Sequence, residues 1–147
     1  MKPIKTTISA TILFFLLQGA VLAQSDSLAE IFKTHMNETV QNVKNSDNAI
    51  EKRAILDTSF NKILKAVERI EKSGQLTEEE FAQLQTFKHS IEEKSDQLNG
   101  QNGFEEVADE DLEDFSDYSQ QAMEQADRTL TLSLTTVLLV VIILLLI

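Results

Sequence analysis

A run of carboxylates near residue 110 is the densest group of side chains in the sequence that could bind a ligand. Residues 109–114 hold five acids in six positions, and carboxylate oxygens are the ligands that Ca²⁺ and Mg²⁺ prefer. The run does not match an EF-hand loop, because the sixth position from Asp109 is Asp114 instead of glycine. The twelfth position is Gln120 instead of glutamate. The candidate cation ligands are Asp109, Asp111, Glu113 and Asp114.

A solvated spacer is the alternative interpretation of this segment, because a dense run of like charges repels itself and stays hydrated. The apolar side chains within the segment suit a further role. An apolar side chain can enter a groove on a partner protein while neighbouring carboxylates face a basic rim. The spacer and docking roles are compatible. The candidate partner-binding residues are Phe104, Leu112, Phe115 and Tyr118.

The sequence holds two histidines, His35 and His89, and no cysteine. Two imidazoles and a glutamate can form a metal site. However, neither histidine has a histidine four residues away, and neither lies in a His-Glu-x-x-His pattern. We therefore expect ordinary surface or boundary histidines, and we predict no cofactor.

Catalytic motifs are absent from the sequence: it has no nucleophile elbow, no phosphate-binding glycine loop and no Cys–His pair. Serines and carboxylates are abundant, so folding could still assemble a Ser–His–Asp group, but no spacing points to one. We predict that the protein is not an enzyme. The formal net charge of −11 also argues against nucleic acid as a partner, because nucleic acids bind basic patches.

Three segments before the acidic run have the apolar spacing of amphipathic helices. Short polar residues at 45–48 and a glycine-containing turn at 73–75 separate them. Thr77 and Glu80 match a capping box at the start of the third segment. The expected helices span residues 25–44, 49–72 and 77–98.

The middle segment has the strongest pattern, with apolar residues in alternating steps of three and four, as in a coiled-coil heptad. Arg53 falls on this seam, and we expect its side chain to reach solvent. Burying three such stripes together predicts a small antiparallel three-helix bundle over residues 24–98. A core of about 75 residues is marginal, so a homo-oligomer formed through the same stripes is a further expectation.

The charge balance changes after residue 98. Residues 24–98 hold 14 acids and 10 bases, whereas residues 99–129 hold 10 acids and one base. Repulsion between like charges opposes a helix in this second segment. We therefore expect residues 99–129 to form an acidic stalk that is flexible or weakly helical.

The first 23 residues have the three parts of a secretory signal peptide. Lys2 and Lys5 make the positive region, and residues 8–17 make the apolar region. Small residues up to Ala23 suit cleavage before Gln24. An uncleaved first membrane helix is the alternative interpretation.

Residues 130–147 are uncharged and, from Val137 onward, entirely aliphatic. Eighteen residues in a helix span roughly 27 Å, which is close to the hydrocarbon thickness of a bilayer. Within lipid, a helix satisfies its own backbone groups. We predict a single transmembrane anchor here. The alternatives are a buried core helix and a removable glycolipid-anchor signal.

Together these features predict an all-α protein with a signal peptide at 1–23, a bundle at 24–98, an acidic stalk at 99–129 and a transmembrane helix at 130–147. The signal and its Ala–Gln junction look bacterial. We therefore expect a single-pass inner-membrane protein with its body in the periplasm or another extracytoplasmic space. The expected function is non-catalytic interaction or scaffolding in the cell envelope, with another envelope protein or a second copy as partner. The alternative is extracytoplasmic binding or sensing of divalent cations by the acidic stalk.

Overall fold

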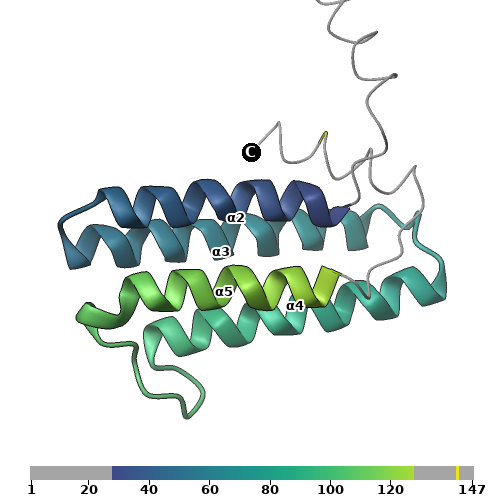
Figure 1. Cartoon of the computed structure of the whole chain (residues 1–147). Coiled ribbons are helices and arrows are strands. Elements are labelled where there is room, and N and C mark those ends of the chain that lie inside the picture. The colour runs from purple at the N-terminus through teal and green to yellow at the C-terminus, as the bar shows by residue number, and fades with distance from the viewer. Residues whose placement is uncertain (1–27, 128–141, 143–147) are drawn as a thin grey trace, which may run out of the picture.

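The computed structural model describes residues 28–127 and residue 142, and this part of the chain folds as a bundle of four α-helices (Figure 1). A 3-10 turn, η1, precedes the last helix. Successive helices run in opposite directions (Figure 1). The elements are α2 (Leu28–Asn45), α3 (Ala49–Lys72), α4 (Glu78–Asn99), η1 (Asp109–Asp111) and α5 (Leu112–Asp127).

The predicted signal peptide at 1–23 lies outside the described residues, and so does the predicted anchor at 130–147 apart from its residue 142. Among the helices that are described, none is both long enough and apolar enough to cross a membrane.

Local capping sets the helix ends where the sequence predicts them. The side-chain oxygen of Asn48 accepts a hydrogen bond from the backbone N–H of Ile50 at 2.9 Å and so caps α3. Thr77 and Glu80 form the expected capping box at the start of α4. Gly100 ends α4 in the left-handed conformation, at φ 61°. The predicted breaks between the first three helices are therefore confirmed.

The core is built from the apolar stripes of all four helices. The rings of Phe32 and Phe87 stack at a centroid distance of 5.0 Å, and Phe60 meets Phe115 edge-on at 6.4 Å. Both pairs join helices that are distant in sequence, so they fix how the helices pack. The largest fully buried side chains are Phe32, Met36, Val43, Leu56, Phe60, Ile63, Ile70, Leu84, Ile91, Leu98 and Leu112.

The bundle has four helices instead of the three predicted, because α5 forms within the segment expected to be a stalk. Leu112 and Met123 of this helix are buried in the core at 0% and 3% exposure. The expectation of a flexible or weakly helical stalk rested on repulsion within the acidic segment. It did not consider cations on the other helices, which offset that repulsion.

Three lysines pair with the acids of α5. On α2, Lys44 lies 2.9 Å from the carboxylate of Asp117, and Lys33 lies 3.7 Å from that of Glu124. On α3, Lys52 pairs with Glu113. Pairs as exposed as the first two contribute little individually. Together with the burial of Leu112, the three pairs explain why an acidic segment packs as a helix.

Arg53 holds the connection between α4 and α5. Its guanidinium donates hydrogen bonds to the carbonyl oxygens of Leu98 and, at 2.6 Å, of Val107. It also pairs with the carboxylates of Glu106 at 3.1 Å and Asp109 at 3.0 Å. The Arg53 side chain is 20% exposed. The sequence predicted that it would reach solvent, but its guanidinium instead binds the end of one helix and the loop to the next.

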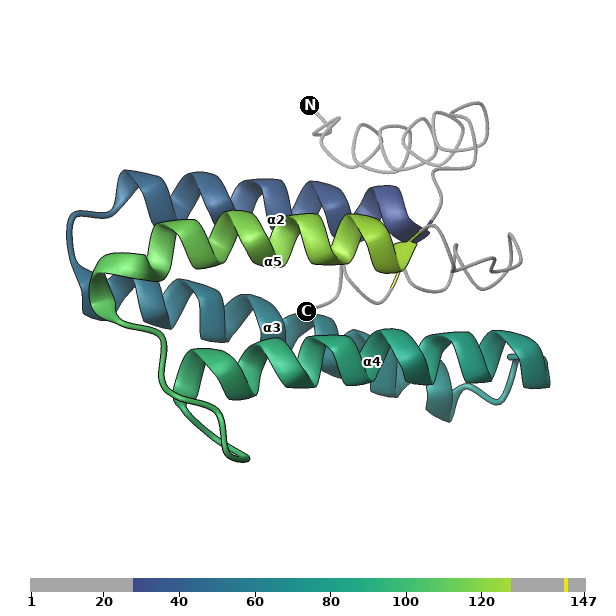
Figure 2. The ribbon, with the colours of Figure 1, turned by 60° about the horizontal axis from the view of Figure 1, so that its bottom comes forward.

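The four helices form two layers, with α2 beside α5 and α3 beside α4 (Figure 2). The start of α2 and the end of α5 lie at the same end of the bundle, where α3 also joins α4 (Figures 1 and 2). The α2–α3 turn and the long α4–α5 connection lie at the opposite end. The first and the last described helical residues therefore lie at one end of the bundle.

A buried serine in α5 gives a direct test of this packing. Within the described part of the chain, the hydroxyl of Ser119 is buried without a hydrogen-bond partner, whereas Ser116 donates to the Glu113 carbonyl at 2.7 Å. An unpaired buried polar group is destabilising, so we expect Ser119→Ala to raise the free energy of unfolding by about 1 kcal/mol. Ser116→Ala, the control, should not raise it. Urea denaturation measures both, and lower stability of Ser119→Ala would contradict the packing.

Candidate functional site

The four candidate cation ligands are not brought together as a metal site. Asp109 already pairs with Arg53, and Glu113 pairs with Lys52. Asp111 and Asp114 are exposed. Among the residues that the structure describes, no group of three or more histidine, aspartate or glutamate side chains is arranged to hold a metal ion.

This arrangement predicts that calcium does not change the helix content of the protein. Because Asp109 and Glu113 have cationic partners in the fold, Ca²⁺ would have to displace Arg53 and Lys52 to bind them. We expect millimolar Ca²⁺ to leave the helix content unchanged, as measured by far-UV circular dichroism of the full-length protein. A gain of helicity that disappears when Asp111 and Asp114 become asparagine would instead support the cation-binding alternative.

The four candidate partner-binding residues separate into two buried and two exposed side chains. Leu112 and Phe115 belong to the core of the bundle. Phe104 and Tyr118 are 38% and 54% exposed. The apolar spacing that suggested a docking segment is also the spacing of a helix that buries one face. The sequence alone does not distinguish these two interpretations.

Tyr118 lies against a buried lysine at the α4–α5 boundary. Its hydroxyl accepts a hydrogen bond from the Lys94 ammonium at 3.3 Å, and the ammonium lies 4.5 Å from the centre of the Tyr118 ring. The Lys94 side chain also donates to the amide oxygen of Gln97 at 3.1 Å. The Tyr118 ring is thus held in place while more than half of the residue faces solvent.

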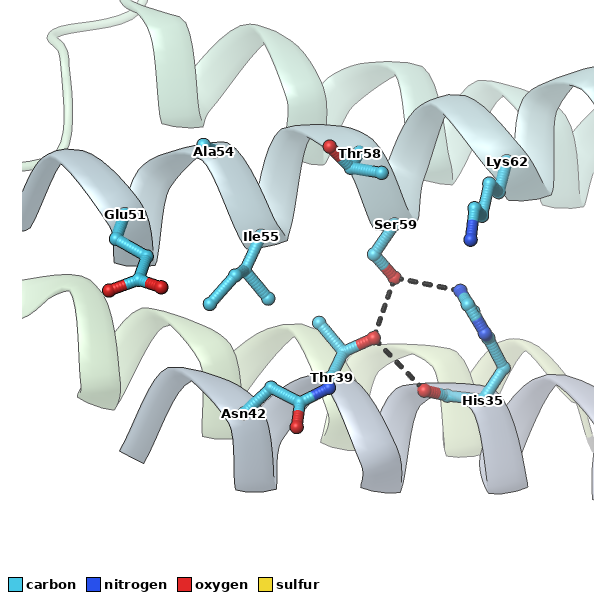
Figure 3. A pocket seen from close by; sticks show the side chains of 9 residues that line it. All are labelled: His35, Thr39, Asn42, Glu51, Ala54, Ile55, Thr58, Ser59 and Lys62. Carbon is cyan, nitrogen blue, oxygen red and sulfur yellow. Dashed lines mark hydrogen bonds between the residues drawn. The ribbon is translucent and has the colours of Figure 1, made fainter. Parts of the chain in front are cut away.

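The two histidines have different surroundings. His89 lies exposed on α4, 4.0 Å from Glu92. His35 is half-buried between α2 and α3 and borders an open pocket of about 330 Å³ (Figure 3). The residues that line this pocket are His35, Thr39, Asn42, Glu51, Ala54, Ile55, Thr58, Ser59 and Lys62.

A chain of polar contacts links α2 to α3 at this pocket (Figure 3). Thr39 donates its hydroxyl proton to the His35 carbonyl at 2.9 Å. The hydroxyl oxygens of Thr39 and Ser59 are 2.8 Å apart, and the Ser59 hydroxyl also lies 3.7 Å from the sulfur of Met36. The Ser59 oxygen also lies 3.0 Å from Nε2 of His35. His35, Thr39 and Ser59 therefore form one hydrogen-bonded group across the α2–α3 interface.

These contacts pair a serine with a histidine but lack an oxyanion hole at Ser59. The Ser59 oxygen lies within hydrogen-bond distance of His35 Nε2, as in a nucleophile–base pair. Ser59 also lies in the middle of α3, where the helix itself uses the neighbouring backbone N–H groups, so they do not form an oxyanion hole. The sequence motifs do not identify Thr39 or Ser59, although each directly precedes a core residue, Val40 or Phe60.

The environment of His35 makes stability depend on pH. Burial lowers the pKa of His35 below its ordinary value of 6.5, and the positive charge of Lys62 lowers it further, against a smaller opposite effect of Glu38. The unfolded chain therefore binds a proton at this residue at higher pH than the folded protein. Stability from His35 is complete above its unfolded pKa, and it decreases as the pH falls from that value toward the folded pKa.

We therefore expect the wild-type protein to lose more stability than His35→Gln between pH 7.5 and pH 5. Urea denaturation of the two proteins at both pH values measures the difference, and the variant serves as the control for the titrating carboxylates. A larger acid-induced loss of stability in His35→Gln than in the wild type would contradict the lowered pKa of His35.

Comparisons with known protein families, curated proteins and solved structures find no match to this chain.

Proposed function

We propose that the protein is an exported, membrane-anchored, non-catalytic interaction or scaffold protein of the cell envelope. The observation that carries the proposal is a bundle whose core is built from residues between Phe32 and Met123. The aliphatic stretch at 130–147 lies beyond that core in sequence. A lipid bilayer is the environment that suits such a stretch best. The expected signal peptide would deliver the bundle across the inner membrane.

The positions of the start of α2 and the end of α5 support an anchored body. Because the start of α2 and the end of α5 share one end of the bundle, the proposed anchor would hold that end at the membrane (Figure 1). The α2–α3 turn and the α4–α5 connection would then face away from it. The end that faces away from the membrane includes Phe104 and the acidic residues before α5. A partner could therefore reach these residues.

The exposed aromatics are the best candidates for partner contact. Tyr118 and Phe104 are the two exposed aromatic residues of the acidic segment, and Tyr and Phe are enriched at protein interfaces. Carboxylates at Glu105, Glu110 and Asp111 are exposed around them in sequence. This combination suits a partner with basic and apolar side chains, such as another envelope protein. Association through the seam of Phe60 has no support, because that seam is buried.

Site-specific photo-crosslinking in cells tests the interaction role. A photo-reactive residue at Phe104 or Tyr118 should give one adduct of the same mass, whereas one at exposed Gln41 on α2 should not. Reversing the charges of Glu105 and Asp111 should remove the adduct while helix content stays unchanged. Equal labelling from all three positions, or no adduct from any, would overturn the assignment of this surface.

A further inference from the structure

The pocket between α2 and α3 carries opposite charges at its two ends. Figure 3 shows Glu51 at one end and Lys62 at the other, with Ile55 between them and the Lys62 side chain extending toward the His35 ring. Eleven residues of helix separate the two charged positions, which corresponds to roughly 16 Å along the axis. At this separation, the two side chains cannot pair with each other.

Neither charge has an ionic partner in the described part of the structure. The Glu51 carboxylate accepts a hydrogen bond from the Ser46 hydroxyl at 2.8 Å, but no lysine or arginine there lies within ion-pair distance of it. Lys62 likewise has no carboxylate within that distance. By contrast, Lys44 and Lys52 are paired with acids. Lys65 on the same helix has no carboxylate partner there either, so what distinguishes Lys62 is its place in the lining of the pocket.

The part of the pocket between the charges combines apolar and hydrogen-bonding groups. Ala54 and Ile55 supply apolar surface, while Asn42 and Thr58 supply an amide and a hydroxyl. An amide side chain can both donate to and accept from a peptide backbone. The volume of about 330 Å³ falls at the lower end of the range for small-ligand sites.

We propose that this pocket binds a short extended peptide, with its C-terminal carboxylate between Lys62 and His35 and its N-terminal amine at Glu51. An extended chain rises about 3.4 Å per residue, so roughly four or five residues span the two ends. A ligand with a single charge would leave the opposite end of the pocket without a partner. A zwitterionic peptide supplies both charges and backbone groups for Asn42 and Thr58.

The surroundings of His35 agree with a carboxylate at that end. Burial and Lys62 both disfavour the protonated ring, while Glu38 on α2 has the opposite effect. A bound carboxylate would add a negative charge near both cationic groups and raise the pKa of His35. The site belongs to the bundle alone, so the inference goes beyond the proposed envelope role and does not depend on the anchor.

Calorimetric titration of the full-length protein in non-ionic detergent tests the site, with tetra-alanine as the probe. We expect amidation of the peptide C-terminus and acetylation of its N-terminus each to weaken binding about tenfold, since each removes one charge contact. Amidation should have a smaller effect in Lys62→Gln than in the wild type, since only His35 remains near the carboxylate, and acetylation should have no effect in Glu51→Gln. Lys65→Gln, a control at an exposed position of α3 outside the pocket, should bind like the wild type.

The amidated and acetylated peptides test the site on the wild-type protein. The test therefore remains decisive even if a variant fails to fold. Two-dimensional NMR of the wild type should show peptide-induced shifts at Thr39, Ile55 and Ser59, with a higher pKa of His35. Absence of heat and of shifts at 10 mM peptide would overturn the proposal. So would equal binding of blocked and free peptides, or binding of acetate or inorganic phosphate as tight as that of tetra-alanine.

Discussion

Replacing Phe60 with aspartate should abolish the folded state. Phe60 is fully buried and its ring contacts Phe115 of α5 edge-on. Loss of a buried phenylalanine side chain alone costs about 3–5 kcal/mol, and a buried unpaired carboxylate adds several kcal/mol. The sum is comparable to the whole stability of a domain of about 100 residues. Far-UV circular dichroism should show that most helicity is lost at 25 °C.

Ile50→Asp is the matched control for this substitution. Ile50 lies in the first turn of the same helix but is 80% exposed, and an acid near a helix N-terminus is mildly favourable. We expect its helicity and urea midpoint to match those of the wild type. Retained helicity in Phe60→Asp would contradict the buried seam on which the bundle depends.

Replacing Arg53 with alanine should lower the free energy of unfolding by about 2–4 kcal/mol, because hydrogen bonds from a charged group are strong. The substitution removes the donor to the carbonyl oxygens of Leu98 and Val107, and it leaves Glu106 and Asp109 without their cation. The connection between α4 and α5 loses its principal polar contacts, so α5 should be the helix most affected. Urea denaturation measures the loss, and hydrogen exchange locates it.

Arg69→Ala provides the comparison, because Arg69 is an exposed arginine on the same helix. Surface substitutions of this kind change stability by about 0.5 kcal/mol or less. Equal effects of the two substitutions would show that the guanidinium of Arg53 contributes no more than a surface charge. Faster hydrogen exchange confined to α2 would also contradict the described contacts.

The sequence predicts the first three helices well because the signals that define them are local. The Asn48 cap and the Thr77–Glu80 box lie within a few residues of the ends that they determine. The apolar spacing of α3 likewise identifies its buried face, including Phe60 and Ile63. Such features depend on neighbours along one helix, so a single sequence is enough to find them.

Contacts between distant residues explain what the sequence did not reveal. Lys52 and Glu113 are 61 residues apart, and Arg53 and the Val107 carbonyl are 54 apart. The repulsion within residues 99–129 is visible in the sequence, whereas the lysines that offset it become neighbours only after folding. The fourth helix could therefore be identified only from the structure.

The pocket was missed for a related reason. His35 appeared isolated in the sequence because its partner Ser59 lies 24 residues away, on another helix. Ser59 and Thr39 stand beside apolar seam residues, where polar side chains must find partners across the interface. Polar residues flanking a predicted seam are the signal that could have identified this contact.

The central functional claim is that the helical body is exported and held at the membrane. Characterising the mature chain in cells tests this claim most directly. Membranes would be washed at alkaline pH, and the retained full-length protein would be identified by mass spectrometry of its N-terminus. We predict that the chain stays in the washed membranes, begins at Gln24, and is released when residues 130–147 are deleted. A chain that still begins at Met1, or that appears in the wash despite an intact 130–147 segment, would contradict the proposal.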